Sequence, residues 1–138
     1  MATPIGFGRR FAGALLLGAV SGAVFLGAGG RLVMRVFALA TSRPPAFTFL
    51  GSLNVLVAGA IAGATGGLAF LVLQRILPKR LWLRGAVFAA ACYIVAIPGF
   101  RPPRPLVFAL FGCAFLAYGV ALVAAWERFV QGRRLTSA

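Results

Sequence analysis

The sequence predicts an all-α fold, a bundle of four transmembrane helices in a single integral membrane domain that covers residues 1–138. Two observations predict it. Hydrophobic residues make up 62% of the 138-residue chain, against the roughly 45–50% that is usual in soluble domains. Four charge-poor apolar runs are also long enough, at about 1.5 Å per residue, to cross a bilayer core of roughly 30 Å. These runs are Phe11–Gly30, Leu50–Leu73, Leu81–Phe100 and Leu106–Trp126.

The first run, Phe11–Gly30, has no charged residue and follows Arg9 and Arg10. It is longer than the apolar region of a secretory signal. Arg31 and Arg35 also separate it from the nearest Ala-x-Ala cleavage pattern. We therefore expect a retained membrane helix.

The second run, Leu50–Leu73, carries the strongest packing signal. At about 100° per residue, four glycines share one of its faces: Gly59, Gly63, Gly66 and Gly67. Gly18 and Gly22 share a face of the first span. Because absent side chains let helices approach closely inside lipid, we expect the first two helices to pack through these faces. The similar stretches Gly18–Ala23 and Gly59–Ala64 fit either independent selection of small residues or a weak inverted repeat, as in many transporters.

Basic residues follow the first two spans. Arg31 and Arg35 stand one helical turn apart and, on a continuous α-helix, point away from the glycine face. Arg75, Lys79 and Arg80 follow the second span. Such side chains bind phosphate or carboxylate groups, or extend from span ends to lipid headgroups. We expect these five residues to contact anionic lipid or an anion.

The last two spans are joined by a proline-rich connection. Glu127 and Arg128 follow the last residue of the fourth span, Trp126, and we expect a local ion pair between these two residues. Cys92 and Cys113 lie inside apolar runs without a Cys-x-x-Cys pattern. In such surroundings cysteine packs as a small hydrophobic residue.

The distribution of Lys and Arg predicts the orientation of the bundle. Nine lie in the N-terminal segment, the second connection and the C-terminal segment, and five lie in the first and third connections. Cytoplasmic segments of membrane proteins carry the excess of Lys and Arg. We therefore expect both termini to be cytoplasmic.

Composition also restricts the classes of function. The chain has 14 Lys and Arg residues, one acidic residue, two Cys and no His. This set is too small for the usual metal sites and contains no pair of groups for acid–base catalysis. The sequence therefore predicts no enzyme, no catalytic residue, and no cofactor or metal site. The basic residues are spread between apolar blocks, which favours anionic headgroups over nucleic acid as a partner.

The abundance of small residues at helical spacing favours a structural or accessory subunit. Such a subunit packs against other membrane protein subunits, or forms a homo-oligomer, through glycine-rich helix faces. Two alternatives stay open. A net charge of +13 is compatible with a small anion channel or transporter, and the paired basic residues are compatible with an anionic-lipid-binding protein.

Three segments, Gly27–Arg35, Phe47–Leu53 and Gln74–Pro78, together with the glycine-rich second span, resemble a group of small bacterial four-helix integral membrane proteins without an assigned function. The resemblance covers the chain through Pro78 and implies a multi-pass protein of the bacterial cell (inner) membrane. Gly51–Gly59 is also similar in outline to small fluoride channels. However, those channels carry Asn where this chain has Leu56, and the third span lacks their polar and aromatic groups. We do not adopt that function.

Overall fold

The fold of the chain is taken from a computed structural model, which describes residues 6–42, 44, 48–99 and 104–135, with side chains described through residue 130. All the secondary-structure elements of the described residues are helical, as predicted. In chain order they are α1 (Phe7–Ser21), the π-helix η1 (Gly22–Ala28), α2 (Gly29–Ala40), α3 (Phe49–Leu73), α4 (Leu81–Ala96), the 3-10 helix η2 (Ile97–Gly99) and α5 (Pro105–Leu135).

Four helical stretches are long and apolar enough to cross a membrane, which gives the chain the architecture of a multi-pass membrane protein. They are Phe7–Ala40, Phe49–Leu73, Leu81–Gly99 and Pro105–Val130. The first and fourth extend beyond the predicted spans at both ends. Phe100, the predicted last residue of the third span, lies outside the described residues.

Local hydrogen bonds explain where α2 ends and α3 begins. The Thr41 hydroxyl donates to the Phe37 carbonyl at 2.8 Å, and Ser42 follows with a left-handed φ of 52°, which ends the helix. Thr48 has an extended backbone and caps α3, because its Oγ1 accepts a hydrogen bond from the Gly51 N–H at 3.2 Å.

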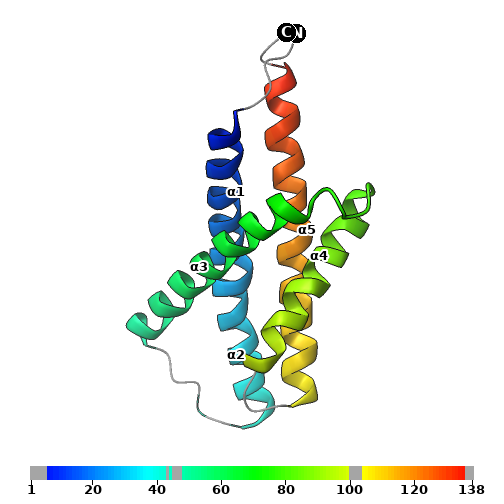
Figure 1. The fold of residues 1–138 in the computed structure, drawn as a ribbon. Helices are drawn as coiled ribbons and strands as arrows, with labels where there is room; N and C mark the ends of the chain where they lie inside the picture. The colour runs from blue at the N-terminus through cyan, green and yellow to red at the C-terminus, as the bar shows by residue number, and fades with distance from the viewer. Residues whose placement is uncertain (1–5, 43, 45–47, 100–103, 136–138) are drawn as a thin grey trace.

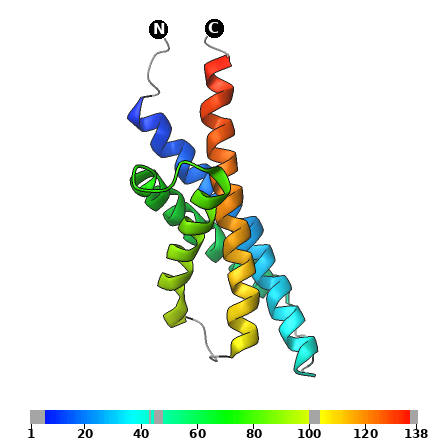
Figure 2. The ribbon, with the colours of Figure 1, turned by 90° about the vertical axis from the view of Figure 1, so that its right-hand side faces the viewer.

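The bundle is built around the long continuous helix that comprises α1, η1 and α2. This helix packs against both α3 and α5, and α4 packs against α5 (Figure 1). The contacts of Gly13 with Phe129 and of Gly30 with Phe111 make the long helix and α5 antiparallel. The start of α1 and the end of α5 therefore lie together, and we call this the terminal end (Figure 2). The end of α2 and the start of α5 form the distal end.

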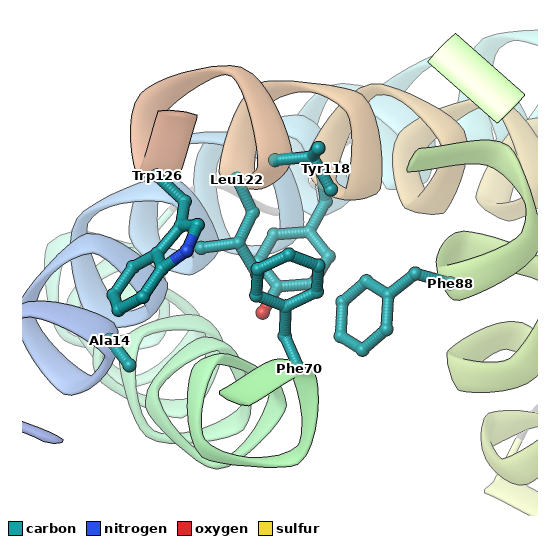
Figure 3. Packing of buried hydrophobic residues seen from close by; sticks show 7 residues of the cluster. Ala14, Phe70, Phe88, Tyr118, Leu122 and Trp126 are labelled. Carbon is teal, nitrogen blue, oxygen red and sulfur yellow. The ribbon is translucent and has the colours of Figure 1, made fainter. Parts of the chain in front are cut away.

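An aromatic core joins three of the helices. Phe70 of α3, Phe88 of α4, and Tyr118 and Trp126 of α5 turn their rings toward one another, beside Ala14 of α1 (Figure 3). Phe70 meets Phe88 edge-to-face with ring centroids 5.4 Å apart, and meets Trp126 at 6.2 Å. Pairs of this kind add about 0.5–1.5 kcal/mol each beyond the burial of their area. The core therefore holds α3, α4 and α5 in place around α1.

Candidate interaction sites

The glycine faces of the long helix and α3 meet, and we call their contact the glycine seam. Its residues are Gly18, Gly22, Gly59, Gly63 and Gly67. A methyl group on Gly22 would overlap the carbonyl oxygen of Gly59 and lie 2.5 Å from the Cα of Gly63. A methyl group on Gly18 would lie 2.9 Å from the Cα of Gly67. These neighbours are backbone atoms, so the two helices are closer than side chains at these positions would allow.

Gly66 lies beside the seam and faces Tyr118 of α5 rather than α1. The Tyr118 hydroxyl is buried and donates a hydrogen bond to the Gly63 carbonyl oxygen at 2.8 Å. Hydrogen bonds between membrane helices contribute about 0.6–1.7 kcal/mol. All six glycines predicted as packing residues are therefore engaged by helices of the same chain. The Tyr118 contact is not predictable from spacing, because its acceptor is a backbone carbonyl.

The π-helix η1 reorients the second half of the long helix. The residues of this helix that face α3 are four, four, five and four positions apart: Ala14, Gly18, Gly22, Gly27 and Arg31. The interval of five lies in η1, where the wider hydrogen-bonded turn accommodates one additional residue. If η1 were α-helical instead, Arg31 would be rotated by about 100° away from α3.

The position of Arg31 therefore corrects the predicted one. A terminal guanidinium nitrogen of Arg31 lies over the first turn of α3, 2.7 Å from the position that a Cβ would take at Gly51. The prediction that Arg31 points away from the glycine face is wrong because it assumed an α-helix throughout. Arg35, one turn further along α2, is exposed.

The five predicted anion contacts form two separate groups. Arg31 and Arg35 lie toward the distal end, and Arg31 is half-buried. Arg75, Lys79 and Arg80 are exposed in the connection that follows the last residue of α3. Because α3 has 25 residues, the two groups lie about 37 Å apart along its axis. A single anion or lipid headgroup does not bridge that separation.

Glu127 pairs with another helix rather than with its neighbour Arg128. Its Oε1 lies 3.4 Å from Nη1 of Arg84, near the start of α4. The Arg84 Nε also donates to the Pro78 carbonyl at 2.9 Å. Both charged side chains are partly exposed, so the pair contributes at most about 1 kcal/mol. The contact ties the start of α4 to α5 and corrects the expected local pair.

The side of α3 away from the seam is exposed, and it carries a stripe of small and polar side chains beside bulky apolar ones such as Ile61 and Val72. Five exposed residues, three or four positions apart, make up what we call the outer face of α3: Asn54, Ala58, Ala62, Thr65 and Ala69. The Thr65 hydroxyl donates to the Ile61 carbonyl of its own helix at 3.0 Å. Asn54 therefore supplies the exposed amide of this face, near the start of α3.

Cys92 and Cys113 are free thiols. The described part of the chain contains no group of three or more His, Cys, Asp or Glu residues that could hold a metal ion. Comparison of the chain with known protein families, curated proteins and solved structures gives no match. The resemblance to small bacterial four-helix membrane proteins therefore stays a prediction.

Proposed function

We propose that this chain is a small structural subunit of an assembly in the bacterial inner membrane. Its partner is a helix of another membrane protein, or of a second copy of this chain, that packs on the outer face of α3. The observation that carries the proposal is that two faces of α3 have different surroundings. The glycine seam is occupied within the chain, whereas the small side chains of the outer face are exposed.

Lipid supplies the physical reason for this choice of face. Apolar side chains gain little by leaving lipid for another helix, so association depends on close packing and on hydrogen bonds between helices. Ala58 and Ala62 are spaced four apart and let a second backbone approach α3. The Asn54 amide both donates and accepts, and a hydrogen bond across helices contributes about 0.6–2 kcal/mol.

A matched pair of substitutions tests the proposal. Ala62→Leu adds bulk to the outer face without touching the glycine seam, and we expect the association constant to fall about tenfold or more. Ala91→Leu makes the same change at an exposed position of α4 and serves as the control. Energy transfer between labelled chains in lipid vesicles measures self-association. Purification in mild detergent, followed by mass spectrometry, identifies other partner proteins.

The proposal fails if the wild-type chain is monomeric in vesicles and also purifies without companions. It fails equally if the Ala62→Leu chain associates as tightly as the wild type. Because residue 62 is exposed, the variant should keep the helical content and melting behaviour of the wild-type chain. Loss of association then reports on the surface rather than on folding.

A further inference from the structure

The half-buried Arg31 has no acidic side chain of its own chain to pair with. Glu127 is the single acidic residue of the sequence, and it lies 3.4 Å from Arg84 at the start of α4. We propose that Arg31, placed over the first turn of α3, binds the phosphate group of a phospholipid in the leaflet at the distal end. The proposal rests on the membrane location proposed above and goes beyond the subunit function.

The absence of a side chain at Gly51 leaves room for the Arg31 guanidinium group against α3. A Cβ at residue 51 would lie 2.7 Å from the Arg31 terminal nitrogen and 2.6 Å from the Thr48 Oγ1. Glycine at this position therefore lets the guanidinium lie directly against the α3 backbone. The additional residue in η1 directs Arg31 to this point, and π-helical segments of this kind occur frequently at functional sites.

The electrostatics of this position favour a negative group from outside the chain. The Nε of Arg31 is buried and has no hydrogen-bond partner among the described residues. The first turn of α3 carries the positive partial charge of a helix N-terminus, which repels the guanidinium. A cation that is half-buried without a counter-charge is costly, and such groups in membrane proteins are paired.

The surrounding charges point to the same partner. Arg35 stands one turn beyond Arg31 and is exposed, and the Arg104 guanidinium lies 5.7 Å from the centre of the Phe37 ring. Among the described residues, Arg31, Arg35 and Arg104 thus lie toward the distal end, and basic residues near the ends of membrane spans attract the phosphate groups of the bilayer surface. Arginine binds phosphate with two parallel hydrogen bonds, which suits the terminal nitrogens of Arg31.

The test measures binding of phosphatidylglycerol to the intact chain by native mass spectrometry. We expect Arg31→Gln to weaken the binding by about tenfold or more, the effect of losing a charge-assisted hydrogen bond. Arg31→Lys keeps the charge but loses the planar donor pair, so we expect a smaller loss. Arg10→Gln changes an exposed arginine of the same long helix at the terminal end. This control should bind lipid as the wild type does.

Gly51→Ala supplies a second variant that leaves the charge in place. The added methyl group displaces the guanidinium, so lipid binding should weaken although Arg31 is present. Gly30→Ala is the matched control, because a Cβ there would meet its nearest neighbour, a ring carbon of Phe111, at 3.9 Å. If Arg31→Gln does not fold, Arg31→Lys and Gly51→Ala decide the question. Circular dichroism and gel filtration check the fold of each variant.

Excess inorganic phosphate distinguishes a headgroup from a free anion. Retention of phosphatidylglycerol in its presence supports a lipid site, whereas its displacement assigns the site to free phosphate and overturns the proposal. Lipid binding that Arg31→Gln leaves unchanged also overturns it. If Arg31→Gln loses self-association but keeps its lipid, Arg31 pairs with a protein carboxylate instead. Loss of association in Ala62→Leu with lipid retained leaves the proposal intact, so the two proposals fail separately.

Discussion

At the scale of single residues, the absence of a methyl group decides how closely α3 approaches the long helix. Gly22 and Gly63 face each other through backbone atoms alone. A flexible side chain would yield to an added methyl group, but a helix backbone yields only if the whole helix moves. The glycine seam is therefore the most sensitive contact of the bundle to small changes in volume.

We expect Gly22→Ala to lower the free energy of unfolding by about 1–3 kcal/mol, the usual cost of overpacking. Gly29→Ala is its control in the same continuous helix, because a Cβ at residue 29 would meet its nearest neighbour at 3.8 Å. Unfolding in mixed micelles, followed by circular dichroism, measures both variants. Equal stabilities of the two variants would contradict the close contact at the seam.

Regular spacing determines how much of this residue-level detail is predictable from sequence. Glycines four positions apart predict a helix face, and the faces of Gly18 with Gly22 and of Gly59 with Gly63 are the ones that meet. Tyr118 carries no comparable signal, since its partner is the Gly63 carbonyl, which every residue type possesses. The pairing of Glu127 with Arg84 is also hidden, because it depends on how α4 packs against α5.

At the scale of elements, η1 shows why a single helical period does not describe the whole first helix. A uniform period of 3.6 residues places Arg31 opposite Gly22, whereas the structure places both against α3. Apolar composition and charge-free length predict the four helices well. Composition does not predict the π-helical segment inside one of these helices. The direction of Arg31 depends on that segment.

Removing one residue from η1 should therefore be tolerated. Deletion of Val24, which is exposed to the surroundings, converts the π-helical turn into an α-helical one and leaves Gly27 and Arg31 facing α3. Deletion of Leu16, an exposed residue of regular α1, instead rotates everything before it by about 100°. That rotation removes Ala14 from its contact with the core.

Thermal unfolding in detergent, followed by circular dichroism, compares the two deletions. We expect a cooperative transition within about 1 kcal/mol of the wild type for the Val24 deletion, and a broad or absent transition for the Leu16 deletion. If both deletions disturb the unfolding transition equally, η1 does not contain an additional residue that the helix can lose. The comparison is internal, since both deletions remove one exposed apolar residue from the same helix.

At the scale of the whole molecule, the bundle carries positive charge at both ends but in unequal amounts. The described basic residues at the terminal side include Arg9 and Arg10, near the start of α1, and the group formed by Arg75, Lys79 and Arg80 after α3. The distal end has Arg31, Arg35 and Arg104. Cytoplasmic segments carry the excess of positive charge, so we propose that the terminal end faces the cytoplasm.

Reporter fusions test this orientation. Green fluorescent protein fused to the C-terminus should fluoresce and alkaline phosphatase fused there should be inactive, because the first folds in the cytoplasm and the second only outside it.

Changing Arg75, Lys79 and Arg80 to Gln leaves six basic residues against five, and we expect a mixture of orientations. Changing Arg31, Arg35 and Arg104 to Gln removes the same number of charges from the distal end. These chains should keep the single orientation of the wild type, because the change enlarges the charge difference. An active phosphatase on the otherwise unaltered chain would reverse the proposed orientation and place the Arg31 phosphate site in the cytoplasmic leaflet.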